Sequence, residues 1–361
     1  MRSRSHALLT ALAAAALFGA ATPLAKLLLG NMPAFMVAGL FYLGSGAGLG
    51  VCLVARHLRR APRAERSGEG EGRNDWQWLA GAIVTGGIVA PALLMFGLLH
   101  TSAATSALLL NLEGVLTAVI AWVAFRENVD LPVFFGMMAI VVASVLLSYE
   151  GGAHLSPGAG LIALACLCWA MDNNFTRNIV RYDAMTIACV KGLVAGAVNL
   201  TIALLCGAAF PGVGLTLAAM ATGLMGYGIS LVLFVIALRH LGAARTSAYF
   251  SVAPLFGALL SLLVWPEMPP AMFWIAAALM ALGVGLHARE RHSHEHQHGY
   301  LEHAHRHHHD AHHQHTHDFP YTGDEPHSHP HVHLPLTHTH AHYPDAEHRH
   351  EHGEQKNRHR Q

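Results

Sequence analysis

Two groups of residues in this sequence could do chemistry, and they lie in very different surroundings. The first is a series of histidines: 24 of the chain's 30 lie in the last 71 residues, where they alternate with polar, acidic and proline residues. Neutral imidazole binds Zn, Ni, Co and Cu ions, whereas the lack of Cys and Met in this segment disfavours Cu(I). We therefore expect Ni, Co or Zn ions to bind this tail, and we expect no cofactor to be required.

The spacing of these histidines predicts many overlapping metal sites and no single built site. Alternating imidazoles offer arrangements of about two to four ligands without a preformed cage, so binding should be moderate and exchangeable. Such a composition cannot form a core, and residues 291–361 are expected to be disordered without metal. The candidate ligands are His294, His296, His298, His303, His305, His307, His308, His309, His312, His313, His315 and His317.

The tail also has two interpretations that do not involve transport. It could be a cytosolic metal buffer. It could also be a polycation that responds to pH, because imidazoles with a pKa of about 6.5 become charged together on mild acidification.

The second group consists of polar residues embedded in apolar sequence. Glu113 lies in the middle of an apolar stretch, whereas Asp172 and Lys191 lie nearer the ends of two others. A charged side chain inside a bilayer is costly unless it is paired or hydrated, so each is a candidate for function. Amides accompany these charges at Asn111, Asn173 and Asn174.

A carboxylate at the depth of Glu113 can hold a cation in one state and a proton in the other, which is the minimal chemistry of proton antiport. A structural role is the alternative: Glu113 and Lys191 could form a buried ion pair, or Lys191 could snorkel to the membrane surface. Lys191 suits a counter-ion better than a ligand. Asp172 lies close enough to the inner surface to be solvated. The amides of Asn173 and Asn174 could equally join helices by hydrogen bonds.

Positioning these residues requires helices that cross a membrane. The chain is 53% hydrophobic and only 12% charged, which excludes an ordinary cytosolic enzyme, a disulfide-built secreted protein and a basic nucleic-acid binder. A bilayer core of about 30 Å needs about 20 apolar residues per helix. Ten windows of that kind predict an all-α membrane protein with ten transmembrane helices: 7–29, 33–55, 76–98, 104–125, 132–149, 158–177, 184–205, 215–238, 244–265 and 270–288.

Lys and Arg occur in alternate loops, from Arg2 and Arg4 at the start of the chain to Arg289 and Arg291 after the tenth window. The positive-inside rule therefore predicts that both termini, and with them the tail, are cytoplasmic. We expect a multi-pass protein of the inner (plasma) membrane. Lys26 falls within a turn of the outer surface, where snorkelling would explain it. The expected partners are the lipid bilayer and a small solute or divalent metal ion; a homodimer stays open, and nucleic acid is not expected.

An internal repeat divides the membrane region. Residues 96–127 align without a gap onto 236–267 at an offset of 140, and the first two helices repeat at an offset of 151. Five helices repeated once must give two units of opposite orientation, because an odd number of crossings inverts the second copy. This is the inverted-repeat plan of secondary transporters. The predicted regions are a first repeat at 1–150, a second at 151–290 and the tail at 291–361.

At this point the chain resembles the EamA type of the drug/metabolite transporter (DMT) superfamily. The likeness rests on the five-plus-five plan, on LFGAATPLAK at 17–26, and on ALLLNLEGVLTAVIAWVAFREN at 107–128 with its mate ending at Glu267. It covers residues 7–289. Similar proteins are exporters with a central cavity between their two halves, and some with His-rich ends are linked to cobalt and nickel resistance. The resemblance implies the same activities for this chain.

The sequence departs from that family at one place. The family often has Pro near the middle of the fourth helix, as Pro254 stands in the ninth, whereas Asn111-Leu112-Glu113-Gly114 occupies that stretch here.

Together these features predict a non-enzymatic exporter that exchanges a small solute for protons. Ni or Co is the leading substrate, with the tail as a cytosolic collector. One alternative is an exporter of amino acids or drug-like metabolites whose tail only buffers or senses metal. Another is a membrane-anchored metal-storage or sensor protein that moves nothing. Glu113 and Asp172 argue against the last alternative, because a pure anchor has no need of charges at membrane depth.

Overall fold

The structure is a computed structural model that falls into two units, residues 1–290 and 291–361. The described residues of the first unit are 2–59, 75–125, 131–149, 156–179, 182–241, 243–266 and 268–287, and those of the second are 293–298, 301–307, 327–333 and 336–341. Six predicted metal ligands and one repeat residue lie outside the described residues: His308, His309, His312, His313, His315, His317 and Glu267.

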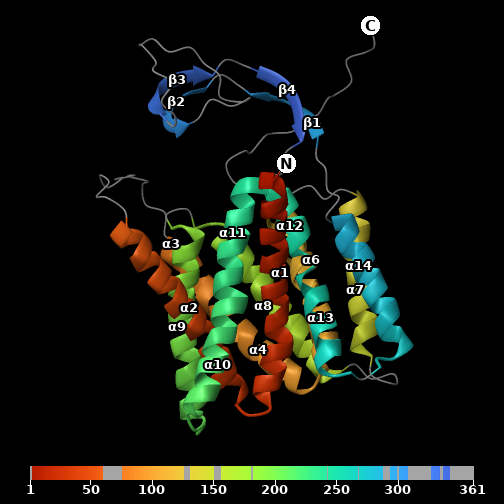
Figure 1. Cartoon of the computed structure of the whole chain (residues 1–361). Coiled ribbons are helices and arrows are strands. Elements are labelled where there is room, and N and C mark those ends of the chain that lie inside the picture. Colours follow the sequence, from red (N-terminus) through yellow and green to blue (C-terminus); the bar gives the residue numbers. More distant parts are fainter. Residues whose placement is uncertain are drawn as a thin grey trace. The chain divides into compact units, whose positions relative to one another are not determined.

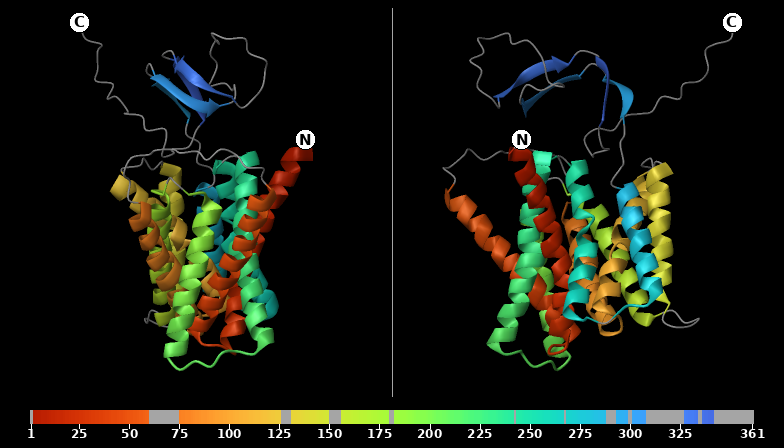
Figure 2. Two further views of the ribbon diagram at one scale, coloured as in Figure 1. Left: turned by 90° about the vertical axis from the view of Figure 1, so that its left-hand side faces the viewer. Right: turned by 45° about the vertical axis from the view of Figure 1, so that its right-hand side comes forward.

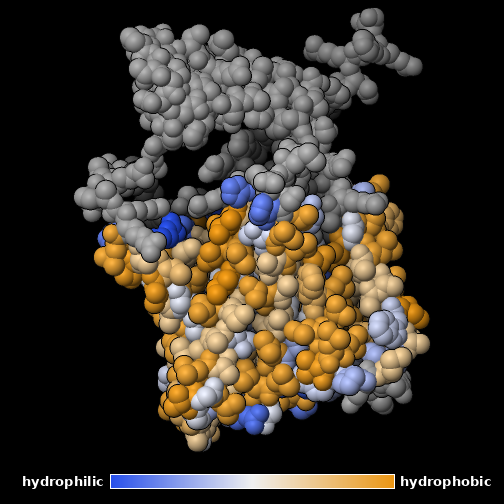
Figure 3. Space-filling view, in the orientation of Figure 1, coloured by the Kyte–Doolittle hydropathy of each residue, from blue (hydrophilic) through white to orange (hydrophobic). Residues whose placement is uncertain are grey.

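The described part of the first unit is a bundle of helices whose flank is largely apolar (Figures 1 and 3). Within the described residues, seven helices are long and apolar enough to cross a membrane: His6–Leu29, Ala34–Leu58, Asp75–Leu99, Ala103–Ala124, Leu131–Ser148, Ala184–Leu205 and Val213–Leu238. The other three predicted windows are occupied by a more polar helix and by two shorter apolar ones. The helices therefore follow the ten predicted windows, and the all-α membrane fold is confirmed.

Six of the ten spans are single helices. They are α1 (Arg2–Leu29), α2 (Ala34–Arg59), α7 (Leu131–Ser148), α8 (Pro157–Thr176), α9 (Ala184–Leu205) and α14 (Ala271–His287).

The third span of each repeat contains a π-helical segment. In the first repeat the order is α3 (Asp75–Ala82), η1 (Ile83–Val89) and α4 (Ala90–Leu99); in the second it is α10 (Val213–Gly223), η2 (Leu224–Ile229) and α11 (Ser230–Leu241). Gly86 in η1 and Gly226 in η2 are 140 residues apart, the offset of the sequence repeat. The two repeats therefore share this distortion, and distortions of this kind often occur at functional sites.

The fourth span of each repeat is broken in the middle. It consists of α5 (Ala103–Leu109) and α6 (Leu112–Phe125) in the first repeat, and of α12 (Ala243–Phe250) and α13 (Ala253–Val264) in the second. Pro254 accounts for the second break, because proline cannot donate a backbone hydrogen bond. In the first break, the Asn111 side chain donates to the Leu108 carbonyl at 3.0 Å, a local bond that competes with the helical ladder.

Helices of one repeat pack mainly against helices of the other. α1 packs on α11 and α13, α2 on α9, α4 on α8, and α7 on α14. The contact between α2 and α9 is close because glycines face it: a Cβ on Gly39 or Gly46 would meet the backbone of α9. Small residues at helix contacts are typical of membrane bundles. The two repeats thus form one interlocked bundle (Figure 2).

We call the side where α1 begins the inner side, because it is predicted to be cytoplasmic, and the opposite side the outer side. On the outer side α5 packs against α13. On the inner side the other halves of the same spans diverge: α6 packs on α8 and α7, whereas α12 packs on α1 and α11. Among the described helices, the two fourth spans therefore pack against each other through their outer halves and against different neighbours through their inner halves.

In the tail, the described residues form four strands in two antiparallel pairs. β1 (Ser293–His298) pairs with β4 (Leu336–Ala341), and β2 (Leu301–His307) pairs with β3 (His327–His333). The register places His294 opposite His340 and His303 opposite His331. An alternation with a period of two matches the repeat of a strand, which accounts for these ladders. Disorder of the metal-free tail stays a prediction.

Candidate functional site

Glu113 lies in the first turn of α6, directly after the break in the fourth span. Its Oε1 accepts a hydrogen bond of 2.9 Å from the Asn173 amide on α8, and the same amide lies 3.3 Å from Thr117 Oγ1. Asn173 is exposed, Glu113 is half-buried, and a Cβ on Gly114 would meet nothing within 4 Å. Glu113 is therefore only partly buried, and its carboxylate is bonded to a neutral amide.

Asp172, the neighbour of Asn173 on α8, faces a different helix. Its Oδ2 lies 2.6 Å from Lys191 Nζ on α9, and Thr176 donates to its Oδ1 at 3.1 Å. The alternative pairing of Lys191 with Glu113 is therefore wrong, as is snorkelling by Lys191. Asp172 is only 3% exposed, so the expectation that it is solvated is also wrong. The counter-ion role of Lys191 agrees with this geometry, with Asp172 as its partner.

The π-helical segment η1 packs against this ion pair. A Cβ on Gly86 would overlap Asp172 Oδ2, and a Cβ on Gly87 would contact the aliphatic part of Lys191. The Gly86 carbonyl accepts hydrogen bonds from Tyr42 Oη at 2.6 Å and Trp169 Nε1 at 3.0 Å. Glycine at these two positions therefore lets the Asp172 carboxylate and the aliphatic part of Lys191 pack against the backbone of the third span.

We call Glu113, Asn173, Asp172 and Lys191 together the centre. Aromatic side chains of other helices lie near it. The ring of Tyr227, in η2, is 5.5 Å from that of Tyr42 and 6.0 Å from that of Phe18, and Phe18 is 5.4 Å from Phe250 on α12. Tyr42 and Tyr227 are both within electrostatic range of Glu113. Sequence reasoning missed these aromatic residues. The Gly-rich stretches around 86 and 226 were a signal, but they also fit simple close packing.

The remaining predicted amides serve helix structure. Asn111 is 8% exposed and, besides the Leu108 carbonyl, reaches Met280 Sδ at 3.7 Å. Asn174 donates to Ala170 O at 2.8 Å and to Thr117 O at 3.4 Å, which joins α8 to α6. Of the six predicted residues, the structure thus brings Glu113, Asp172, Asn173 and Lys191 together, while Asn111 and Asn174 support the helices that hold them.

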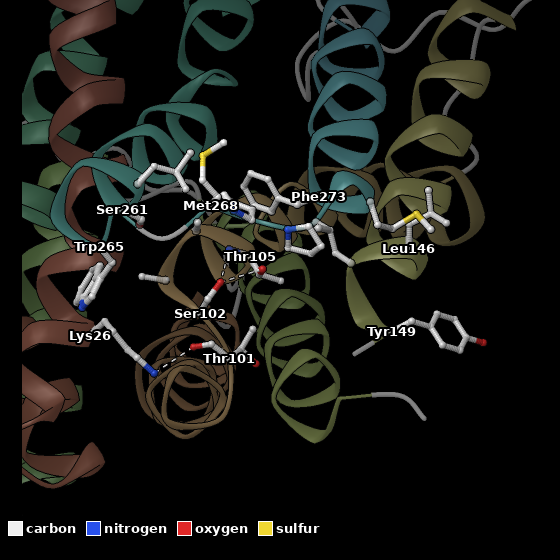
Figure 4. A pocket seen from close by; sticks show the side chains of 17 residues that line it. Lys26, Thr101, Ser102, Thr105, Leu146, Tyr149, Ser261, Trp265, Met268 and Phe273 are labelled. Carbon is white, nitrogen blue, oxygen red and sulfur yellow. Dashed lines mark hydrogen bonds between the residues drawn. The ribbon is translucent and has the colours of Figure 1, made fainter. Parts of the chain in front are cut away.

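Lys26, near the outer end of α1, does not snorkel as expected. Its Nζ donates to the carbonyl of Leu98 and, at 3.1 Å, to that of Thr101, so it caps the end of α4. Beside it lies an outer cavity of about 470 Å³, bordered by Lys26, Thr101, Tyr149, Trp265 and Phe273 among others (Figure 4). Glu113 is not among its lining residues, so the outer cavity and the Glu113 centre are separate features.

The described residues contain no group of three or more His, Cys, Asp or Glu side chains placed to hold a metal ion. In the described part of the bundle, the oxygen ligands at the centre are therefore limited to Glu113, the ion-paired Asp172 and neutral groups.

The chain was compared with known proteins. The EamA-like transporter family matches residues 5–149 and 156–288, so one match falls on each repeat. A protein of Methanothermobacter thermautotrophicus described as "Uncharacterized transporter" is 28% identical over 286 residues, which are 74% of this chain and 81% of that protein. "Uncharacterized transporter YyaM" of Bacillus subtilis is 27% identical over 209 residues, 54% of this chain and 67% of that protein.

One solved structure, described only as "Crystal structure of protein", matches with a TM-score of 0.56 and 21% identity, covering 78% of this chain and 96% of that one. At that identity the likeness concerns the fold alone. The two family matches, which together span most of the chain, show that this multi-pass membrane protein belongs to the EamA-like transporter family.

Proposed function

We propose that this transporter exports a small cationic solute from the cytoplasm in exchange for protons, and that the cation and the proton bind alternately at Glu113. One observation carries the proposal: Glu113 is partly exposed at a helix break, and among the described residues its carboxylate is bonded to the neutral Asn173 and forms no ion pair. A lone carboxylate in a membrane is stabilised when either a proton or a cation neutralises it. The two ligands therefore compete for one group.

The packing of the fourth spans supports access from the inner side. α6 and α12 pack on different neighbours there, while α5 and α13 pack against each other on the outer side. A transporter of this plan works by rocking its repeats about a fixed site near the middle of the membrane. In the outward-facing state, α6 would approach α12 and α5 would separate from α13. Protons arriving from outside would then displace the cation from Glu113.

Two substrate classes stay open within this proposal. Ni or Co is favoured by the tail, which we propose to be a cytosolic collector of Ni, Co or Zn ions. The tail would raise the metal concentration on the cytoplasmic side of an inner-membrane protein whose two termini both lie in the cytoplasm. An amino acid or drug-like metabolite is favoured by the aromatic rings near Glu113 and by the small number of oxygen ligands there; the tail would then only buffer or sense metal.

Transport in vesicles tests the proposal. The purified full-length protein is reconstituted, the vesicles are given a pH gradient, and movement of Ni²⁺, Co²⁺ or an organic ammonium ion is followed together with the internal pH. We expect cation movement coupled to proton movement in the wild type and its loss in Glu113→Gln, which keeps the size and hydrogen bonding of the side chain but removes its charge.

Asp183→Asn is a matched control. It also turns an acid into an amide, but Asp183 is an exposed residue that caps α9, where asparagine caps equally well. This variant should transport normally. Wild-type coupling in Glu113→Gln would remove that residue from the mechanism.

A further inference from the structure

The charges near the centre of the bundle can be summed from the described residues. Asp172 and Lys191 form an ion pair of 2.6 Å and neutralise each other. Glu113 is bonded to Asn173, the neighbour of Asp172, and lies within electrostatic range of both charges of the pair. The charges of Glu113, Asp172 and Lys191 are therefore considered together. Lys26 is at the outer end of α1, bonded to the carbonyls of Leu98 and Thr101. The described residues of the centre therefore carry one net negative charge, that of Glu113.

This balance decides what the centre can hold without residual charge. One proton on Glu113 brings the net charge to zero, and so does one bound cation with a single charge. A divalent cation would leave one positive charge at membrane depth as long as Lys191 stays an ammonium ion. Uncompensated charge in a low-dielectric environment is costly. Because of the ion pair, the centre is suited to bind a proton or a cation with a single charge.

The groups around the centre agree with an organic cation. The rings of Phe18, Tyr227 and Phe250, all partly exposed, belong to α1, η2 and α12, and Tyr227 also contacts Tyr42, which donates a hydrogen bond to Gly86 beside Asp172. Aromatic faces attract alkylammonium groups through their quadrupole, and they also bury apolar substrate surface. A transition metal ion needs more ligands than Glu113 supplies, and no cluster of three such ligands occurs among the described residues.

Resting on the proposed function, we propose that the Asp172–Lys191 pair sets the charge of the substrate: the centre accepts an organic ammonium ion with one positive charge and an apolar or aromatic body. The Lys191 ammonium group neutralises Asp172, so only the Glu113 carboxylate is left to bind a substrate cation. Each transport cycle then carries one substrate charge outward and one proton inward. The exchange is electroneutral, so a pH gradient drives it and the membrane potential does not.

Selectivity of the full-length protein in vesicles tests this directly. The probes are phenyltrimethylammonium, which has one permanent charge and an aromatic body, a bis-quaternary dication of similar groups, and Ni²⁺. We expect phenyltrimethylammonium to exchange for protons at the same rate with and without a potassium diffusion potential. Preferred movement of the dication or of Ni²⁺, or a rate that follows the potential, would overturn the proposal.

Two variants change the charge balance by design. Lys191→Gln removes the counter-ion of Asp172, so in alkaline buffer, where carboxyl groups lose their protons, the centre can carry two negative charges and the ratio of dication to monocation transport should rise at least about tenfold. Adding Asp172→Asn to that variant restores one negative charge, and selectivity for the monocation should return. The double variant also controls for damage to the fold, because it retains neither member of the ion pair and yet should transport the monocation.

The outcomes separate this inference from the proposed function. If Ni²⁺ exchanges for protons in the wild type and Glu113→Gln abolishes that exchange, the proposed function stands and the charge limit is overturned. An unchanged ratio in a folded, active Lys191→Gln would also overturn it. If none of the probes moves with protons in any variant, the proposed function fails together with the inference.

Discussion

The two broken spans, one in each repeat, have the same backbone plan but different side chains at the break. The breaks between α5 and α6 and between α12 and α13 occupy equivalent places in the two repeats. The second break follows from Pro254, and among the described residues no acid lies beside it. The first is built from Asn111, and Glu113 follows it within one turn. Duplication thus supplies the broken span twice, whereas the acid at the break occurs in one copy.

The aromatic rings reinforce this contrast. Glu113 lies on α6 of the first repeat, whereas its amide partner on α8 and the rings of Tyr227 and Phe250, on η2 and α12, belong to the second repeat. The proposed site therefore combines a carboxylate of one repeat with an amide and aromatic rings of the other. Rocking of the repeats would change the distance between the carboxylate and these partners, which is how an inverted repeat can couple movement to binding.

Moving the carboxylate from one break to the other should produce the largest effect. In Glu113→Gln combined with Ala253→Glu, the acid stands at the equivalent position of the second repeat. Ala253 is 1% exposed, and no amide is bonded there as Asn173 is bonded to Glu113, so we expect no proton-coupled transport. Recovery of transport in vesicles would show that either break can carry the site.

The two π-helical segments should differ in their tolerance of a methyl group. Gly86→Ala forces a Cβ into Asp172 Oδ2 and should destabilise the protein by about 3 kcal/mol, since overpacking of a rigid contact is costly. Gly226→Ala places its Cβ 2.8 Å from the Ala21 methyl, where a small shift relieves the overlap; about 1 kcal/mol is expected. Thermal unfolding in detergent measures both. Equal losses would show that the carboxylate does not rest on η1 as described.

Neighbouring amides on α8 should separate binding from structure. Asn173→Ala removes the hydrogen bond to Glu113 and should raise the half-saturating substrate concentration about tenfold, the effect of about 1.4 kcal/mol, with little change in thermal stability. Asn174→Ala breaks a contact between α8 and α6. It should lower the thermal stability and leave the half-saturating substrate concentration nearly unchanged. Transport kinetics and unfolding temperatures of both variants decide between these roles. A stability loss confined to Asn173→Ala would reverse the assignment.

Removing the tail should have the smallest effect on transport. A chain ending at residue 290 keeps every described helix of the bundle, so we expect proton-coupled export of the organic cation at nearly the rate of the full chain. Metal binding by the full chain should weaken as pH falls below about 6.5, because protons compete with metal for imidazole. Calorimetry with Ni²⁺ at two pH values measures this. Unchanged affinity in the chain without its tail would place the metal sites elsewhere.

Several features could be predicted from the sequence for clear physical reasons. Apolar windows about as long as a bilayer is thick predicted the ten spans, and the offset of 140 indicated the repeat and its inversion. Glu113 stood out because an acid in the middle of such a window is rare. Each of these signals depends only on composition and spacing along one helix.

The partners of the charged residues could not be predicted in the same way. Adjacent residues of a helix point about 100° apart, so Asp172 and Asn173 face different neighbours, and only the rotation of α8 within the bundle decides which. For that reason Lys191 was matched to the wrong acid among the alternatives. Lys26 was expected to snorkel to the outer surface, but its ammonium group donates hydrogen bonds to two carbonyls at the nearby end of α4.

Protonation of Glu113 itself tests the central claim most directly, because it does not depend on knowing the substrate. Infrared difference spectra between alkaline and acidic buffer would show the carbonyl stretch of a protonated carboxylic acid inside the protein. The account predicts this band in the wild type and in Asp183→Asn, its absence in Glu113→Gln, and its disappearance when a transported cation is added. A band that persists unchanged in Glu113→Gln would contradict the claim that Glu113 binds the proton.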